Sequence, residues 1–294
     1  MRRTTMSFKE INCEGKRRND KRGRPRKYQD SFILAIFLYQ TLKQYSYREV
    51  LQELKQLGHE IPSLNDYYYR VRHLDEGILK LLLEKVGQYL AGKNKDKIRC
   101  YIADATGFAY GDIYNLNWRL GTEIRSVKSH IRLEVVIAVD DEDNAVIIVC
   151  EASGAYASEV KMLYRALNRV DFIKGLPFIA DRGYDSVNII QKILDIGLIP
   201  AIKVKETFRM RIRHPLRRLS NQNWSEYGKK RYRIESLFGN IKNKANSVFR
   251  AKRENMAKKL AIAWAILWNF CMILTFLFYI LFVLIECLIS KNFF

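Results

Sequence analysis

The sequence has few cysteines and few acidic residues for its length, and it lacks any paired-cysteine motif. Its five cysteines are scattered over 294 residues, and no two form a Cys-x-x-Cys pair. A disulfide scaffold and a zinc ribbon are therefore disfavoured, and a reducing compartment is expected. The basic N-terminus has no apolar stretch of the kind that a secretory signal contains, so we expect a cytoplasmic protein.

Acidic residues are outnumbered by basic ones, and the basic excess lies in two separate blocks. The chain holds 51 Lys and Arg against 31 Asp and Glu, which gives a net charge of +20. Residues 1–30 carry a local charge of +7, and residues 201–260 carry one of +14. This charge indicates a polyanionic partner, either nucleic acid or an anionic membrane surface. The alternative is a solvated tail together with a solvated helix face.

Charge is absent altogether from residues 260–285, close to the C-terminus. The run satisfies the length rule for a membrane span, which takes roughly 20 apolar residues. It includes two tryptophans and Asn269, so its first half suits a buried helix equally well. We favour an apolar C-terminal helix and tail over residues 259–294, with a membrane span as the alternative. In either case the Lys pair at 258–259 places the preceding chain on the cytoplasmic side.

Residues 1–29 form a basic arm that we expect to be extended. The Gly-Arg-Pro stretch within it opposes a helix, and the surrounding like charges repel one another. Arginines around a Gly-Arg-Pro core resemble an AT-hook, which would place Arg22, Arg24 and Arg26 in a narrow A·T-rich minor groove. A generic phosphate-binding tail is the alternative.

Residues 30–92 are predicted to be helical and to contact DNA. Ser46 and Ser63 can each cap a helix whose apolar residues recur at helical spacing. Two helices joined by a short glycine-containing turn are typical of a helix-turn-helix. Arg70 and Arg72 would then face a DNA groove. An ordinary helical bundle is the alternative.

At Ile98 the apolar pattern changes from helical spacing to short strands. Strands followed by an alternation of helix and strand favour an α/β sheet with helices on both faces. The acidic residues at 140–144 are interpreted as a hairpin turn and not as a metal site. We expect strands at 98–104, 131–139, 145–151, 178–181 and 198–204, helices at 158–170, 185–194 and 230–246, and a basic loop before the last helix.

Three carboxylates of this region are positioned to share one site. Asp104 and Asp181 each end a predicted strand, and ligands of open α/β sheets bind beyond such strand ends. On the last helix, Arg231, Glu235 and Lys242 fall within about 40° of one another at 100° per residue. Clustered carboxylates are unfavourable unless a cation neutralises them, and their oxygens prefer hard ions. We therefore predict a site for Mg²⁺ or Mn²⁺, in which two ions clamp a displacement at phosphorus.

At these residues the chain resembles the DDE-class transposases of insertion sequences. The resemblance covers about residues 98–260. The sequence Asp-Arg-Gly-Tyr-Asp at 181–185 matches the family. The family's last block is Tyr, two residues, Arg, three residues, Glu, six residues and Lys. Arg231, Glu235 and Lys242 keep the last two of these spacings.

The resemblance implies a fold and a set of site residues. The fold is an RNase H-like catalytic domain, expected over 98–258, with a mixed sheet flanked by helices. The triad that would bind metal and carry out catalysis consists of Asp104, Asp181 and Glu235. Arg231 and Lys242 would contact DNA phosphates near the cleaved end, and Tyr227 would be a further DNA-binding residue. Gly228 stands at the family's tyrosine position, and Tyr227 lies one residue before it.

We therefore expect a transposase that cleaves DNA strands and transfers them. It would bind the terminal inverted repeats of its own element, expose a 3′-hydroxyl by hydrolysis, and use that hydroxyl to attack target DNA. Because two ends must be joined, we expect a homodimer or larger multimer on DNA, associated with the nucleoid. Two alternatives remain: a catalytically inactive, transposase-derived DNA-binding protein, and a membrane-tethered basic protein.

Overall fold

The computed structural model describes most of the chain after the basic arm. It covers residues 27–111, 116–120, 123–127, 129–206, 212–246 and 248–291. Within these ranges, side chains are described except at 116–127 and beyond residue 274. Arg22, Arg24 and Arg26, which we expect to contact DNA, lie outside the described residues.

In the described part of the chain, four α-helices precede the sheet, and serine side chains start two of them. The helices are α1 (Asp30–Lys43), α2 (Tyr47–Gln56), α3 (Leu64–His73) and α4 (Glu76–Lys93). Ser46 and Glu49 form a reciprocal capping box at the start of α2. The Ser63 hydroxyl accepts a hydrogen bond from the Asp66 N–H at the start of α3. The caps predicted at Ser46 and Ser63 are therefore confirmed.

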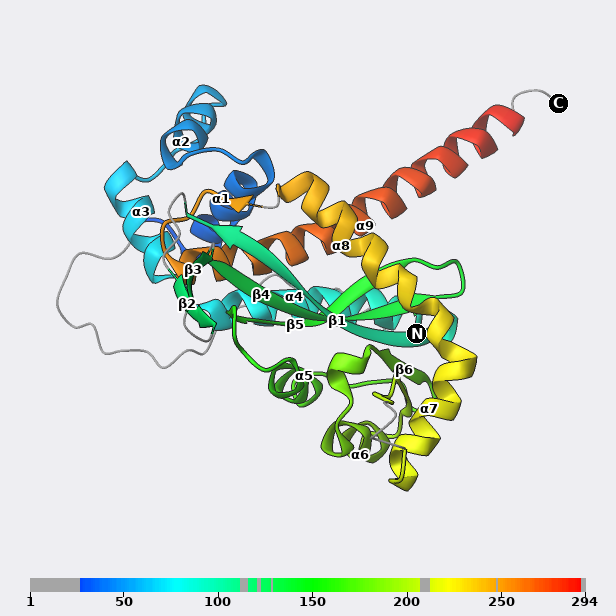
Figure 1. Ribbon diagram of the computed structural model, residues 1–294. Coiled ribbons are helices and arrows are strands. Elements are labelled where there is room, and N and C mark those ends of the chain that lie inside the picture. The colour runs from blue at the N-terminus through cyan, green and yellow to red at the C-terminus, as the bar shows by residue number, and fades with distance from the viewer. Residues whose placement is uncertain are drawn as a thin grey trace, which may run out of the picture.

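A mixed sheet forms the centre of the molecule (Figure 1). The strand order is β5-β4-β1-β6-β7, and the short β8 extends the pairing of β1. The first three strands of this order pair antiparallel, whereas β1, β6 and β7 pair parallel. The strands are β1 (Ile98–Tyr110), β4 (His130–Asp140), β5 (Ala145–Gly154), β6 (Pro177–Ala180), β7 (Ile199–Ile202) and β8 (Val248–Phe249), and β2 (Leu116–Leu120) and β3 (Glu123–Val127) form a separate hairpin. The expected mixed α/β fold of RNase H-like type is confirmed.

The acidic stretch between β4 and β5 is a hairpin turn, as predicted. Asp140 Oδ1 accepts hydrogen bonds from the backbone N–H groups of Glu142 and Asn144. Asp143 adopts a left-handed backbone conformation, with φ at 65°. The Asp140 side chain therefore stabilises the turn itself.

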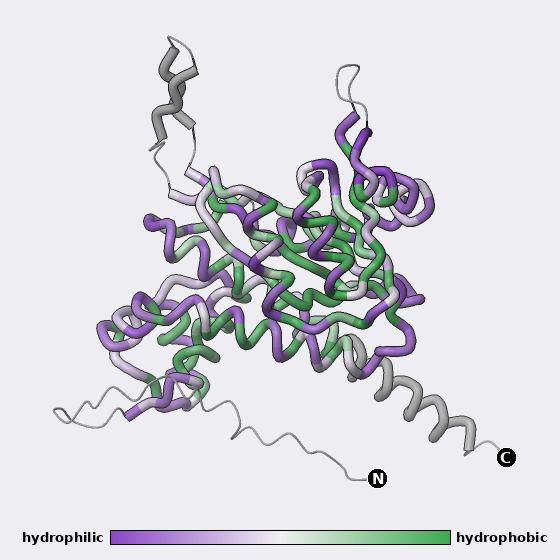
Figure 2. Tube along the Cα trace, turned by 90° about the horizontal axis from the view of Figure 1, so that it is seen from below, coloured by the Kyte–Doolittle hydropathy of each residue, from purple (hydrophilic) through white to green (hydrophobic). Residues whose placement is uncertain are grey.

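Helices cover both faces of the sheet and form two apolar cores. The helices α5 (Glu159–Leu167) and α6 (Val187–Asp195) enclose one core. The other core contains α8 (Tyr232–Ala245), the first part of α9 (Glu254–Lys291) and residues of α1 to α4. Hydrophobic residues gather in the middle of the molecule and hydrophilic residues on its outer turns (Figure 2). The N-terminal helices thus share a core with the sheet.

The expected basic loop before the last helix contains a helix of its own, α7 (Pro215–Tyr227), which corrects the prediction. The segment is basic and has little apolar periodicity, so its sequence resembles a loop. The His214 side chain caps the helix, and Pro215 occupies its first turn. The Ser220 hydroxyl accepts a hydrogen bond from the N–H of Ile202 on the edge strand β7 and donates one to the carbonyl of the same residue. Contact with the sheet therefore stabilises α7 where local propensity is weak.

The first half of the apolar C-terminal run is a core helix. Glu254–Leu274 is long and apolar enough to cross a membrane, but 56% of its most apolar window is buried within the protein. Asn269 is fully buried, and its side chain pairs with both the N–H and the carbonyl of Ile147 on β5. The described side chains of this half of the run therefore fit a packed core helix.

Candidate active site

Two of the three predicted acidic residues are brought together by strand register. The parallel pairing of β1 with β6 aligns Ala103 with Ala180. The next residue of each strand is an aspartate, Asp104 on β1 and Asp181 after β6. The reasoning from strand ends was right for Asp181 and wrong for Asp104. Asp104 lies in the middle of β1, because the strand continues along β4 on its other side to residue 110.

The third acidic residue approaches from α8, and all three converge on one guanidinium group. Arg231 Nη2 lies 2.8 Å from Asp104 Oδ2 and 3.8 Å from Asp181 Oδ2. Arg231 Nη1 donates to Glu235 Oε1 over 2.8 Å, one helical turn further along the chain. The structure therefore brings Asp104, Asp181 and Glu235 around Arg231, a residue that we expected to contact DNA.

The electrostatics of the site reflect this crowding. Burial raises the pKa of Asp104, and the charge of Asp181 acts in the same direction. The Ala105 N–H and the Arg231 guanidinium oppose the rise by stabilising the carboxylate. Burial alone would lower the pKa of Arg231, but the neighbouring carboxylates, Asp104 foremost, raise it overall. Three acids and one base leave the cluster with an excess of negative charge.

The donor chemistry of the cluster fits a hard divalent ion. Its ligands are carboxylate oxygens, which select Mg²⁺ or Mn²⁺ over softer metals. They already surround one cationic group, and each of the three acids keeps some exposure to solvent. Among the described residues, however, no three acidic, His or Cys side chains are close enough together to hold a metal ion directly. The site therefore suits a metal in its donors while a guanidinium stands between them.

The Asp-Arg-Gly-Tyr-Asp segment positions Asp181 through buried contacts that the sequence did not reveal. The Tyr184 hydroxyl donates to Glu134 Oε2 over 2.7 Å, and both side chains are buried. Gly183 lies close to Glu159 of α5: a Cβ there would lie 2.6 Å from Glu159 Oε2, the end of a flexible side chain. Asp185 accepts two hydrogen bonds from Arg217 of α7. The motif indicated this loop, but no pattern in the sequence pointed to Glu134 and Arg217 as its partners.

The DNA-contact candidates on the helices fall into different settings. The Arg70 side chain is largely buried, and it donates to Asp30 and to the Tyr28 carbonyl, so the structure places it inside the helical region. Arg72 is exposed. Lys242 of α8 lies over the Phe108 ring of β1 at 5.8 Å. Arg70 therefore supports the fold, whereas Arg72 remains on the surface as expected.

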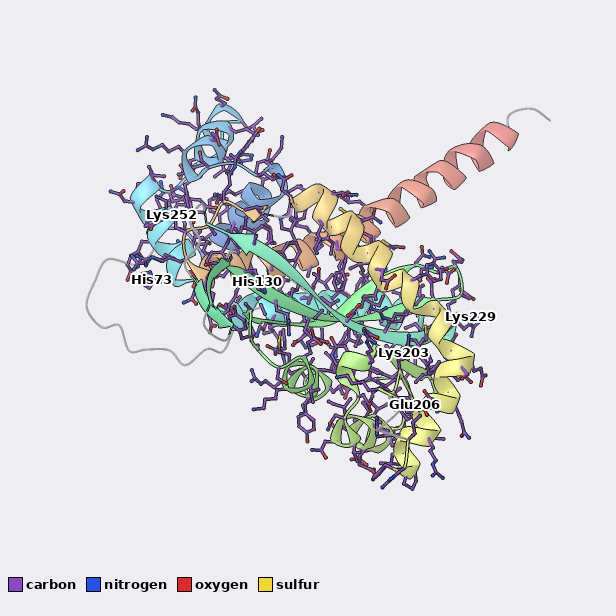
Figure 3. All side chains as sticks on the ribbon, viewed as in Figure 1. His73, His130, Lys203, Glu206, Lys229 and Lys252 are labelled. Carbon is purple, nitrogen blue, oxygen red and sulfur yellow. The ribbon has the colours of Figure 1, made fainter. Side chains whose placement is uncertain are left out.

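The basic segment at 201–260 extends over a long stretch of the surface. Lys203 and Lys229 lie beside α7, whereas Lys252 lies beside the N-terminal helices (Figure 3). The candidate site on α8 lies between these two regions along the chain. Basic side chains are therefore present on both sides of the carboxylate cluster in sequence.

Packing explains why Gly228 stands where the family has a tyrosine. A Cβ at Gly228 would lie 2.6 Å from the ring of Trp224, so no larger side chain fits there. Gly228 begins the short 3₁₀ turn that carries Arg231. Tyr227 ends α7 and packs partly buried against the core. The indole of Trp224 thus takes the space that a side chain at position 228 would need.

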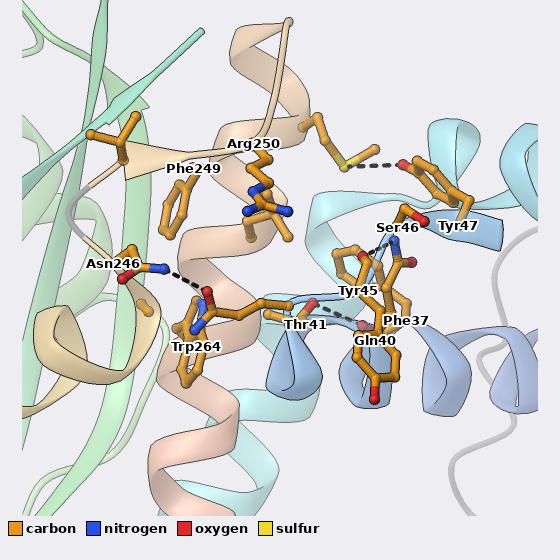
Figure 4. A pocket seen from close by; sticks show the side chains of 15 residues that line it. Phe37, Gln40, Thr41, Tyr45, Ser46, Tyr47, Asn246, Phe249, Arg250 and Trp264 are labelled. Atoms are coloured by element: carbon orange, nitrogen blue, oxygen red, sulfur yellow. Dashed lines mark hydrogen bonds between the residues drawn. The ribbon is translucent and has the colours of Figure 1, made fainter. Parts of the chain in front are cut away.

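A cavity of about 250 Å³ lies elsewhere, at the junction of the N-terminal helices with β8 and α9. Figure 4 shows the aromatic side chains that line it, including Tyr45, Phe249 and Trp264. Asn246 Nδ2 donates to Gln44 Oε1 across its wall over 2.6 Å. None of the three predicted acidic residues lines this cavity.

Comparison with known proteins adds a family and two distant structural likenesses. Residues 95–270, more than half of the chain, match the family model described as the transposase DDE domain. An uncharacterized protein of Aquifex aeolicus (strain VF5) is 33% identical over 231 residues, which are 76% of this chain and 71% of that protein. The piggyBac transposase synaptic complex with hairpin DNA aligns with 89% of this chain and 69% of its own, at 10% identity and a TM-score of 0.44. The Mos1 mariner paired-end complex with Mn aligns with 85% and 81%, at 12% identity and a TM-score of 0.23.

Proposed function

This chain belongs to the transposase DDE domain family, and from that premise we propose that it cleaves and transfers DNA strands at the ends of an insertion sequence. Asp104, Asp181 and Glu235 would be its catalytic carboxylates. The observation that carries the proposal is their convergence on one cationic group from three segments far apart in the chain. Acidic side chains gather in this way where a positive charge has to be held.

The carboxylates would hold Mg²⁺ or Mn²⁺. When bound, two such ions activate a water or a 3′-hydroxyl for attack at phosphorus and stabilise the leaving oxygen. Asp104 is oriented for this task by the Ala105 N–H, which donates to its Oδ1 over 2.9 Å. Asp181 is oriented by the Arg182 N–H over 2.6 Å. Because the backbone fixes one oxygen of each aspartate, the second oxygen is left for a cation.

DNA is the proposed partner, since the charge of the chain is strongly positive and lies close to the site. Lys242 follows Glu235 by two turns on α8 and would hold the phosphodiester strand. Arg231, which lies four residues before Glu235, would do the same. Two element ends must be joined, so we propose that a multimer forms on DNA.

The experiment that tests this proposal is a nicking assay on a duplex made from the DNA that adjoins the reading frame. Asp104→Asn removes the charge at nearly constant volume. We expect Mn²⁺-dependent nicking to fall to the level of a metal-free reaction, while duplex binding is retained. Asp143→Asn is the matched control, since Asp143 lies in the β4–β5 turn and pairs with Arg233. Undiminished nicking by Asp104→Asn would contradict the proposal.

The rival function is a DNA-binding protein without catalysis. It is favoured if the natural chain binds the duplex but gives no nicks under Mn²⁺.

A further inference from the structure

We propose that Arg231 is the resident counter-ion of the carboxylate site, and that it exchanges its carboxylate partners for a DNA phosphate when divalent ions bind. The inference rests on the proposed function and goes beyond it, because it assigns one residue to both states of the site. Arg231 would pair with the three acids in the free protein and with a DNA phosphate in the protein that has bound metal and DNA.

Arg231 lies between the acids that would hold a divalent ion. A single nitrogen, Arg231 Nη2, contacts both Asp104 and Asp181, while Nη1 contacts Glu235. A divalent ion held by the same acids would have to displace this nitrogen. Ion and guanidinium therefore compete for the same oxygens, and they cannot both occupy the position between the two aspartates.

Arg231 is less firmly held than Arg217, a structural arginine of the same chain. Arg217 donates from Nε and Nη2 to the two oxygens of Asp185, and Nη2 also donates to the Lys205 carbonyl. Arg231 divides its terminal nitrogens among three separate acids. Its Nε is buried and, within the described residues, has no hydrogen-bond partner. Arg217 is thus fixed by a two-point contact, whereas Arg231 has no such contact with any one acid.

A DNA phosphate is a suitable new partner for the Arg231 guanidinium. Its planar fork binds phosphate through two parallel hydrogen bonds. Arg231 ends the 3₁₀ turn Gly228–Arg231, and α8 begins at the next residue. A side chain at such a junction can change direction by rotating about its own bonds while α8 stays in place. A DNA strand brought to the acids would therefore offer a partner of the opposite charge within the same region.

Competition between the Arg231 guanidinium and a divalent ion has a thermodynamic consequence that can be measured without catalytic turnover. In the free protein the guanidinium must be displaced, so its presence weakens metal binding. When DNA draws the guanidinium away, metal affinity rises, and by reciprocity metal raises DNA affinity by the same factor. Without Arg231 the free protein should bind metal more tightly, and DNA should raise its metal affinity by a smaller factor.

The test is a Mn²⁺ binding isotherm, recorded by calorimetry or by the loss of free-ion paramagnetic resonance, on the full chain without DNA. We expect Arg231→Gln to bind Mn²⁺ about tenfold more tightly than the natural protein, within the range usual for coupled sites. Arg233→Gln is the matched control. It removes the same charge two residues away, from a side chain that pairs with Asp143 outside the site, and should leave Mn²⁺ affinity unchanged. Arg231→Lys keeps the charge without the fork and should bind Mn²⁺ with intermediate affinity.

A second set of isotherms adds a short duplex. The duplex should raise the Mn²⁺ affinity of the natural protein and have a much smaller effect on Arg231→Gln. Equal or weaker Mn²⁺ binding by Arg231→Gln would overturn the counter-ion proposal, provided that Asp104→Asn still abolishes Mn²⁺ binding. If Asp104→Asn binds Mn²⁺ like the natural protein, the proposed metal site itself fails, and this inference fails with it.

Discussion

At the scale of single residues, the pair of Glu134 and Tyr184 supports the site from behind. Glu134 lies on β4 opposite Ala105, the neighbour of Asp104. Burial raises the pKa of Glu134 well above its ordinary value of 4.5, and the hydrogen bond from Tyr184 only partly opposes this. The nearby charge of Asp104 raises it further. Burial therefore favours the neutral form of Glu134 in the pair, which joins the Asp181 loop to β4.

We predict that Tyr184→Phe destabilises the protein more than Glu134→Gln does. Removing the hydroxyl leaves a buried carboxyl without its donor, which costs about 1–3 kcal/mol. Glu134→Gln keeps the volume and an acceptor for the Tyr184 hydroxyl, so it should cost less. Urea unfolding of both variants measures the difference. A larger loss for Glu134→Gln would mean that the carboxylate is charged and needed as such.

The same pair predicts a pH dependence of stability. The folded state keeps a proton on Glu134 that the unfolded state loses above 4.5. This contribution to stability is therefore present at low pH and is lost as pH rises through the window above 4.5. Glu134→Gln lacks the titration, so its stability relative to the natural protein should improve across this window. Urea unfolding at several pH values would show it, and a pH-independent difference would contradict the assignment.

Part of the site could be predicted from the sequence, for a physical reason. Two apolar runs that each end in an aspartate were enough to predict that Asp104 and Asp181 lie together, although Asp104 lies within β1 and not at its end. A helical wheel gave the side of α8 that carries Glu235, but not the direction of the Arg231 side chain. That direction depends on the charges of two other segments. Glu134 could not be found either, because a glutamate within an alternating strand pattern suggests a solvent-facing position.

At the scale of elements, both edges of the sheet are closed by side chains from helices. Ser220 and Asn223 of α7 bind backbone groups of β7. At the opposite edge, Asn269 and Trp268 of α9 bind backbone groups of β5. Unpaired strand edges favour association with other chains. The two helices therefore complete the sheet as well as covering it.

We predict that Asn269→Leu destabilises the protein although it makes α9 more apolar. The N–H and carbonyl of Ile147 would both lose their partner, which should cost about 2–5 kcal/mol in total. Urea unfolding measures the loss. Asn243→Leu on the exposed face of α8 is the control and should have little effect. In a membrane-spanning helix the same change would be favourable, so a neutral or stabilising result would support the membrane alternative.

The elements that sequence analysis missed or shortened depend on tertiary contacts. The second half of β1 includes Ala105 and Gly107, which have weak strand preference, but it pairs with β4 along its whole length. The helix α7 is polar and basic, and it forms against β7. By contrast, α6 and the β4–β5 hairpin carry strong periodicity or turn signals and agree with prediction to within a few residues.

At the scale of the whole molecule, the N-terminal helices and the sheet behave as one packed body. Residues of α1, α3 and α4 belong to the same apolar core as α8 and α9. Lys259 of α9 donates to the carbonyls of Val71 and Arg72 at the end of α3, and burial lowers its pKa. A DNA segment held by α3 would therefore be fixed relative to the carboxylate site.

The basic arm is the remaining proposed contact with DNA, and its charge allows a test at this scale. We predict that replacing Arg22, Arg24 and Arg26 together by Gln lowers duplex affinity and flattens its salt dependence. Each lost phosphate contact reduces the slope of log K against log salt by about 0.9. If these arginines enter a minor groove, the variant also loses any preference for A·T-rich over G·C-rich duplexes.

The matched control replaces Lys16, Arg17 and Arg18 in the same arm, which removes an equal charge outside the Gly-Arg-Pro core. Fluorescence anisotropy with both duplexes over a range of salt concentrations compares the two variants. An AT-hook requires that only the first variant loses base preference, because the control residues would contact phosphates alone. Equal effects of the two variants would indicate a generic phosphate-binding tail. If neither variant changes the salt slope, the arm does not contact DNA, and the charge at 201–260 must account for binding by itself.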